Sequence, residues 1–362
     1  MLLYILNIIS IPIYALLIKD RRKFIILVAI QLFLILALRE ITVGVDLDNY
    51  LGGYNYISRM DFGELLSSLR PTGVSDLTWQ FEYENGYTVL NWILSHMGLG
   101  FHGLLILCAA INVGSVSYFI YRYSKKPWIS FLVYCALGFY MADFGLLRHS
   151  LALSMCLLSY CFLDRKRYFA SALAFFLALC FHRTSILFVP MLLLLIIHIK
   201  DVTKKRFLYL LLGSLVVLAF AAPIYNNLLS NVMVSMGKNY TGAEDIEINK
   251  KIFVYLFLAI AMLIGYKFSN KKNRIENVSC YALIFTIWFT IIGFYNAFLT
   301  RALPFYSIFL ILLIPDYFEQ YRNQKSVVVL EAILTILLVG YMYSIVAGSA
   351  IDPYVIYKGV LS

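Results

Sequence analysis

The sequence predicts an all-α polytopic membrane protein with about twelve transmembrane helices, and three observations support that fold class. Of the 362 residues, 62% are hydrophobic and only 14% are charged, against about 25% charged in ordinary globular domains. The mean hydropathy is +0.80. Runs such as 188–199 and 327–343 are apolar on every side, whereas a surface helix of a soluble protein needs a polar face. These observations exclude an ordinary soluble domain.

Basic clusters fix the predicted topology. The first apolar run precedes its charges, which favours a first span over a cleavable signal peptide. Six clusters rich in lysine and arginine hold 20 of the chain's 30 basic residues and are expected in the cytoplasm: 19–23, 122–126, 164–167, 200–206, 267–274 and 321–325. The net charge of +10 therefore reports topology and indicates no nucleic-acid partner.

Spans that alternate between these loops place both termini outside. The predicted spans are 2–18, 24–38, 103–121, 128–143, 145–163, 168–181, 185–199, 207–222, 251–267, 278–296, 302–318 and 327–347. We expect one transmembrane domain over 1–362, with a long outer loop at 39–100 and a second at 223–250. Residues 86–100 of the first loop are apolar but too short to cross, which favours an interfacial helix. The six cysteines fall in apolar segments and are expected to be core residues.

The hairpin between two basic clusters is short for two crossings. Residues 168–199 give each leg about 16 residues, or about 24 Å at about 1.5 Å per residue. That length is less than the hydrocarbon thickness of about 30 Å, so the apex is expected to lie below the outer surface. The apex falls between Arg183 and Thr184, beside His182. This polar run is thus predicted at the level of lipid head groups.

Two further hairpins place an arginine at the same level. The midpoint of 127–164 lies between Gly145 and Leu146, which places Arg148 and His149 at the apex, and that of 275–321 lies three residues before Arg301. Arg39 ends the second span. Arginines near a bilayer are costly and usually functional, although snorkelling or pairing with Asp143 or Glu84 would also explain them. Converging guanidinium groups suit a dianionic pyrophosphate, whose oxygens they bind in pairs.

Several blocks of sequence resemble the EpsG/Wzy family of bacterial polysaccharide polymerases. They are LREITVGVDLDNY (38–50), YENGYTVL (83–90), the segment 145–187 from GLLRHS to CFHRTSIL, TRALPFYSIFLILLIP (300–315) and DPYVIYKGVL (352–361). Their order and spacing cover nearly the whole chain. The central block is the most specific, and Gly-x-Asp is the weakest. Many relatives have a glutamine where this chain has His149, which leaves the role of that position open.

The resemblance implies a polymerase on the outer face of the bacterial inner membrane, with a core like that of the GT-C glycosyltransferases and O-antigen ligases. Such an enzyme moves a growing glycan from undecaprenyl diphosphate onto the next lipid-linked repeat unit. The product is a lipopolysaccharide O antigen, a capsule or an exopolysaccharide. The resemblance implies no metal or other cofactor. Its implied partners are the lipid-linked oligosaccharide, the bilayer, a chain-length regulator and a flippase.

The reaction assigns roles to the polar residues. Without a metal, preorganised cations must stabilise the leaving pyrophosphate, and Arg148 and Arg301 are the first choices. Arg183 and Arg39 are expected to assist in binding substrate. An imidazole accepts protons near neutral pH, which favours His182 as general base over a role in orientation or capping.

Other residues are expected around the substrate. His149 is expected to support the site. Asp46 and Glu84 would act as alternative bases, orient an arginine or bind sugar hydroxyls. Tyr50, Tyr87 and Tyr140 could stack on sugar faces, although tyrosine also favours membrane interfaces.

Three rival functions stay open. A metal-dependent lipid-linked glycosyltransferase would use Asp46 and Asp48 to hold Mg²⁺ or Mn²⁺. An O-antigen ligase would share the arginine and histidine chemistry and differ in its acceptor. A transporter or flippase would be expected to show repeated halves and broken helices at mid-membrane, and the sequence favours neither feature.

Overall fold

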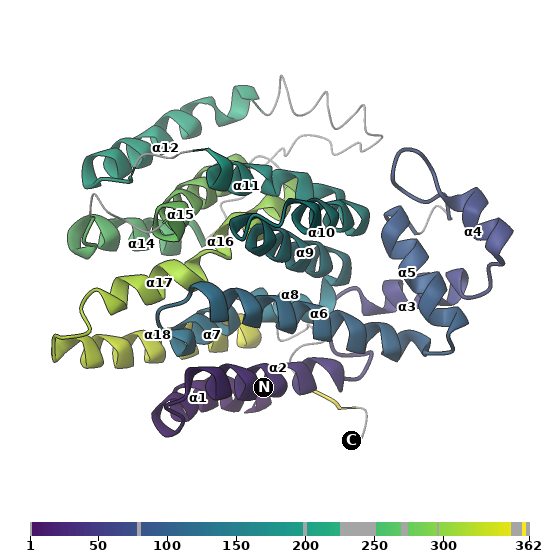
Figure 1. The fold of residues 1–362 in the computed structure, drawn as a ribbon, viewed down its shortest axis with the longest axis horizontal. Coiled ribbons are helices and arrows are strands. Elements are labelled where there is room, and N and C mark those ends of the chain that lie inside the picture. The colour runs from purple at the N-terminus through teal and green to yellow at the C-terminus, as the bar shows by residue number, and fades with distance from the viewer. Residues whose placement is uncertain are drawn as a thin grey trace. The chain divides into compact units, whose positions relative to one another are not determined.

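A computed structural model describes residues 2–77, 81–197, 201–224, 251–268, 274–294, 297–348 and 357–359. Within these ranges the regular elements are α- and 3-10 helices. Extended pairing in the same ranges amounts to two isolated bridges, Arg39 with Gly359 and Val74 with Glu84. The all-α prediction is confirmed for the described chain (Figure 1).

Nine of the predicted spans each coincide with a single helix, because an apolar run between basic clusters satisfies its backbone hydrogen bonds internally. These helices are α1 (Leu2–Leu17), α2 (Arg21–Ala37), α6 (Gly100–Tyr123), α9 (Leu147–Asp164), α10 (Tyr168–Phe181), α12 (Lys204–Ile224), α14 (Lys251–Gly265), α15 (Arg274–Ile292) and α18 (Ser326–Gly348).

The other three predicted spans are interrupted. α7 (Pro127–Ala136) and α8 (Phe139–Gly145) meet at a bend of 51°. The 3-10 helix η1 (Arg183–Phe188) leads into α11 (Val189–Ile196). The 3-10 helix η3 (Ala297–Ala302) leads into α16 (Leu303–Ser307) and then α17 (Leu310–Glu319). Both α11 and α16 carry proline in their first turn, where the missing N–H costs nothing.

The described residues contain four helical segments long and apolar enough to cross a membrane, or five if the bent α7–α8 pair is one span. The four are Gly100–Tyr123, Arg274–Ile292, Thr300–Glu319 and Ser326–Ser344, and shorter apolar helices accompany them. The protein is therefore membrane-integral. The full set of twelve crossings and the GT-C-like core stay predictions.

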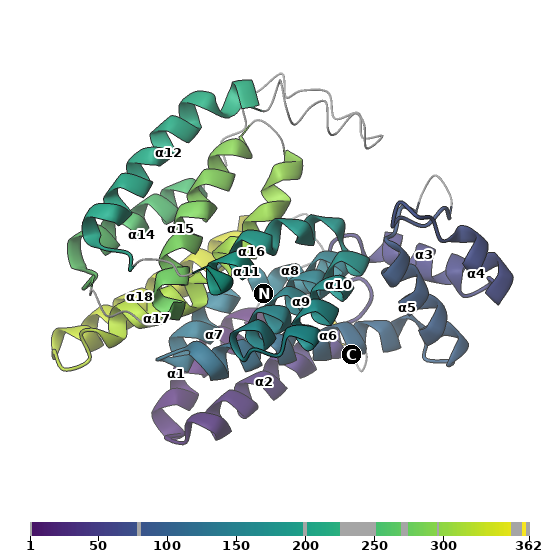
Figure 2. The same ribbon diagram turned by 45° about the horizontal axis from the view of Figure 1, so that its top comes forward.

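The chain forms two compact units, residues 1–186 with 323–362 and residues 187–322. In the first unit α9 and α10 pack side by side, and the Ser159 hydroxyl donates to the Ser171 carbonyl at 2.9 Å. In the second unit α12 and α14 pack on α15 (Figure 2). The single membrane domain predicted for 1–362 stays a prediction. Residues 225–250 of the second predicted outer loop lie outside the described residues.

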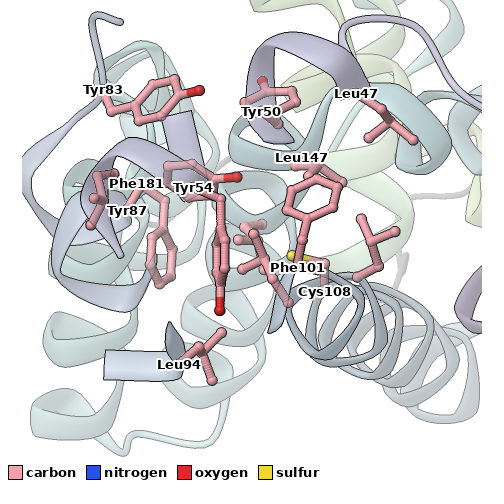
Figure 3. Packing of buried hydrophobic residues seen from close by; sticks show 14 of the residues in the cluster. Leu47, Tyr50, Tyr54, Tyr83, Tyr87, Leu94, Phe101, Cys108, Leu147 and Phe181 are labelled. Atoms are coloured by element: carbon pink, nitrogen blue, oxygen red, sulfur yellow. The ribbon is translucent and has the colours of Figure 1, made fainter. Parts of the chain in front are cut away.

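The segment 39–100 is folded rather than extended. It contains α3 (Leu47–Ile57), α4 (Phe62–Ser68) and α5 (Asn85–His96), and α5 occupies most of the stretch expected to be interfacial. Its location at a membrane surface stays a prediction. Buried side chains of α3 and α5 form one apolar cluster with Leu147 of α9 and Phe181 of α10 (Figure 3). This cluster holds the segment against the ends of two long helices.

Candidate active site

Glu84 is the centre of a buried polar cluster in the first unit. Its Oε2 accepts a hydrogen bond from Arg148 Nη1 at 2.7 Å, and its Oε1 lies 2.8 Å from His182 Nδ1. The backbone N–H of Arg183 also donates to Oε1, at 3.2 Å. The structure thus brings together Glu84, Arg148 and His182, which lie far apart in the sequence, with Glu84 in the 83–90 block and the other two at opposite ends of the 145–187 block.

Local backbone contacts place Glu84 at this point. Glu84 is the N-cap of α5, and the residue before it is held by the Ser75 N–H, which donates to the Tyr83 carbonyl at 2.8 Å. Gly86 lets α5 approach the end of α10, because a Cβ there would lie 2.5 Å from Cys180 Cβ. A glycine two residues after the carboxylate therefore permits the contact between Glu84 and His182.

His182 ends α10 and turns its ring to the carboxylate. Its backbone is extended (φ −159°, ψ 118°), and its carbonyl accepts from the Ser185 hydroxyl at 2.5 Å. An ionised carboxylate only accepts hydrogen bonds, so Nδ1 is the donor to Glu84. In the neutral imidazole this leaves Nε2 as the acceptor. The geometry therefore supplies a histidine able to take up a proton at Nε2.

The electrostatics keep Glu84 ionised. Burial favours the neutral acid, but the hydrogen bond from His182 and the charge of Arg148 outweigh it and lower the pKa of Glu84 to about 2. The side chain of Glu84 is only 6% exposed. A carboxyl with so low a pKa is a poor general base. Of the roles expected for Glu84, the geometry therefore favours orienting Arg148 over acting as a base.

Arg148 is the second residue of α9 and is held on several sides. Its Nη1 also donates to the Glu82 carbonyl at 2.7 Å. Its Cζ lies 4.9 Å from the ring centroid of Tyr83 and 5.9 Å from that of Tyr50, within the range of cation–π attraction. The buried Nε–H has no hydrogen-bond partner in the structure. A fixed guanidinium on a side chain that is 22% exposed is suited to an anionic ligand.

Other predicted residues surround this cluster. The His149 ring lies 5.4 Å from the His182 ring, centroid to centroid. Tyr50 stacks on Tyr83 at 6.0 Å and is 7% exposed. The Arg183 side chain is exposed, and it is its backbone N–H that contacts Glu84.

The remaining predicted residues lie in different settings. Asp46 is exposed and precedes α3 in the left-handed region (φ 64°). Arg39 is 1% exposed and donates to backbone carbonyls of Leu36 and Phe144. Arg301 is exposed in η3 of the second unit. Tyr87 and Tyr140 are fully buried, so in this structure neither offers a ring face for sugar stacking. The roles predicted for Asp46, Arg39 and Arg301 stay predictions.

Sequence reasoning did not single out Tyr83 or the Glu82 carbonyl, although both contact Arg148. The signal available was their position in the two residues that precede Glu84. Within the described residues, no group of three or more histidine, cysteine, aspartate or glutamate side chains has a spacing that could hold a metal.

The fold and the cluster define an integral membrane protein with a carboxylate, an arginine and a histidine joined at the ends of its helices. The model of the EpsG family matches residues 2–358, essentially the whole chain. The chain therefore belongs to the EpsG family, which confirms the resemblance seen in its sequence blocks. No curated protein and no solved structure gives a significant match to it.

Proposed function

We propose that this protein is a membrane glycosyltransferase that polymerises lipid-linked oligosaccharide repeat units. The growing glycan leaves undecaprenyl diphosphate and is joined to a hydroxyl of the next lipid-linked unit, outside the cytoplasmic membrane. Membership of the EpsG family supports the reaction class. The single structural observation that supports the site is the joining of Arg148 and His182 through one ionised carboxylate.

In the proposed reaction the bond between the anomeric carbon and the diphosphate oxygen breaks, and the diphosphate leaves with the electron pair. The acceptor hydroxyl oxygen bonds to the anomeric carbon and gives its proton to His182 Nε2. The guanidinium of Arg148, whose side chain is 22% exposed, stabilises the charge on the departing diphosphate. A preorganised donor of this kind contributes about 3 kcal/mol, or about 100-fold in rate.

Glu84 carries out two tasks in this scheme. It holds His182 in the tautomer whose Nε2 accepts a proton, and it stabilises the imidazolium that forms. It also holds Arg148 at a fixed position through Oε2. Because the pKa of Glu84 is low, the carboxylate keeps its charge while His182 is protonated.

The test is chain growth by the purified protein in detergent, with lipid diphosphate-linked repeat units followed on a gel. We expect polymer with and without EDTA, and none with Arg148→Ala. Arg59→Ala is the matched control, because Arg59 is an exposed arginine in the same segment between α2 and α6. Growth that needs Mg²⁺, together with an active Arg148→Ala, would replace this proposal by the metal-dependent rival.

A further inference from the structure

Arg39 is a charged side chain enclosed by protein. It follows α2 and is 1% exposed. Its Nη2 donates to the Phe144 carbonyl at 3.0 Å and its Nη1 to the Leu36 carbonyl. Its Cζ lies 5.2 Å from the centroid of the Phe144 ring. The guanidinium thus joins the end of α2 to the last turn of α8.

The same carbonyl receives a second close contact from the segment that follows Arg39. Gly44 has φ +143°, and a Cβ there would lie 2.2 Å from the Phe144 oxygen. Only glycine fits this backbone conformation at this distance. The segment 39–44 therefore encloses the Phe144 carbonyl from two directions.

The C-terminal segment holds this arrangement in place. The Glu40 N–H donates to the Lys358 carbonyl at 2.8 Å, and Arg39 forms a bridge with Gly359. The Tyr357 hydroxyl donates to the Ile35 carbonyl at 2.9 Å. The backbone around Arg39 is thus tied to a segment more than three hundred residues further along the chain.

Phe144 lies four residues before Arg148, at the corner between α8 and α9. Leu146 forms this corner (φ −88°, ψ 58°), and its N–H donates to the Ala142 carbonyl at 2.8 Å. Because helices are stiff, a displacement of the end of α8 is passed to the first turn of α9. Arg148 occupies that turn, and its 2.7 Å bond to Glu84 depends on the position of the corner.

We propose that Arg39 is a positioning residue that fixes the α8–α9 corner and thereby holds Arg148 in its reactive place. This inference rests on the proposed function of Arg148 and replaces direct substrate binding as the role of Arg39. A misplacement of about 1 Å costs up to about 100-fold in rate. A lysine at position 39 keeps the charge but lacks the planar fork that reaches two carbonyls.

The experiment measures single-turnover glycan transfer by full-length protein in nanodiscs. Arg39→Lys is introduced into two backgrounds, the wild-type protein and the Arg148→Lys variant. In the wild type we expect transfer to slow by about 10-fold or more, with a change in KM for the lipid-linked donor below about 3-fold. In Arg148→Lys the same substitution should slow transfer by less than about 2-fold, because the group that Arg39 positions is already missing.

Gly44→Ala provides a second variant that leaves Arg39 intact and disturbs the same carbonyl. It should show the same dependence on Arg148. Gly98→Ala is its control, because Gly98 also has a positive φ (+74°) but has open space where a Cβ would be. Arg59→Lys is the control for the loss of an arginine. Thermal unfolding of each variant distinguishes a slower transfer step from a loss of folded protein.

The outcomes separate the two proposals. Equal slowing by Arg39→Lys in both backgrounds, or no slowing in the wild type, would overturn the positioning role alone. An Arg148→Lys variant as fast as the wild type would instead overturn the proposed function of Arg148.

Discussion

Arg148 and Arg39 are both predicted at the outer ends of helices, yet their surroundings differ. The side chain of Arg148 is 22% exposed, pairs with an ionised carboxylate and lies over tyrosine rings. Arg39 is 1% exposed and donates to backbone carbonyls. An arginine that meets a carboxylate at a partly open position is suited to exchange contacts with a ligand, whereas one enclosed by carbonyls stabilises the fold around it. Residue type and depth alone do not separate these roles.

The largest effect is expected for His182→Ala. Loss of a general base costs about 100-fold to 10,000-fold in rate, so chain growth should fall by at least about 100-fold. Initial rates with lipid-linked repeat units are the measurement. His96→Ala is the control, because His96 stacks on Trp92 at 4.1 Å and is exposed. Near-normal growth by His182→Ala would assign the base to another group.

The next largest effect is expected for Glu84→Gln, with a loss of about 100-fold, because a neutral amide forms no ion pair with Arg148 and its single acceptor oxygen cannot serve both Arg148 and His182. Glutamine keeps the shape of the side chain, so the change tests charge rather than packing. Initial rates at several pH values measure it. Since the pKa of Glu84 is lowered to about 2, Glu84 should stay ionised between pH 5 and pH 8. Its ionisation should therefore add no step to the pH dependence of the wild-type rate in that range.

The same carboxylate predicts a pH-dependent stability difference. A depressed pKa stabilises the folded protein above the ordinary carboxyl range and loses that effect as pH falls toward the folded value. The Tm of Glu84→Gln should therefore lie below that of the wild type at pH 7. The gap should shrink from about pH 4.5 downward, as thermal unfolding in detergent would record. A gap that widens in acid would contradict an ionised Glu84.

A smaller effect is expected for Gly86→Ala. The added Cβ would meet Cys180 at 2.5 Å, which forces α5 away from α10 and lengthens the contact between Glu84 and His182. We expect a fall in rate of about 10-fold, consistent with a displacement well below 1 Å. Cys180→Ala removes Sγ but keeps the Cβ that clashes. The double variant Gly86→Ala with Cys180→Ala should therefore show the same fall in rate. Full activity of Gly86→Ala would show that this approach is not required.

The smallest effect is expected at Tyr83. Tyr83→Leu removes the ring face beneath Arg148, worth about 1 kcal/mol, so the rate should fall about 5-fold. Tyr83→Phe keeps the face and loses the hydrogen bond from its hydroxyl to the Asn49 carbonyl at 2.9 Å. It should retain a larger share of the activity. Equal rates for the two variants would exclude a contribution from the ring.

Much of the helical fold was predictable, because apolar runs between basic clusters have one favourable conformation in a membrane. The span predicted at 168–181 matches α10 (Tyr168–Phe181), and that at 2–18 matches α1 to within a residue. The bend of 51° between α7 and α8 was not predicted, since hydropathy carries no information on backbone direction. The 3-10 segments η1 and η3 were missed for the same reason.

The residues of the site could be predicted from the sequence, but most of the contacts between them could not. Arg148 and His182 were expected to be catalytic, but Glu84 was assigned several roles because nothing local links it to residues 64 and 98 positions away. Arg39 was expected to bind substrate, because its burial depends on a C-terminal segment that pairs with it only in the fold. Long-range contacts of this kind decide which polar residues meet a substrate.

The most direct test of the central claim is the single-turnover rate of Arg148→Lys at saturating lipid-linked donor, with donor binding measured on the same protein. The lysine keeps the charge and removes the fork. We predict a rate at least about 100-fold below that of the wild type, with donor affinity changed by less than about 3-fold. A rate close to that of the wild type would show that Arg148 does not stabilise the leaving diphosphate.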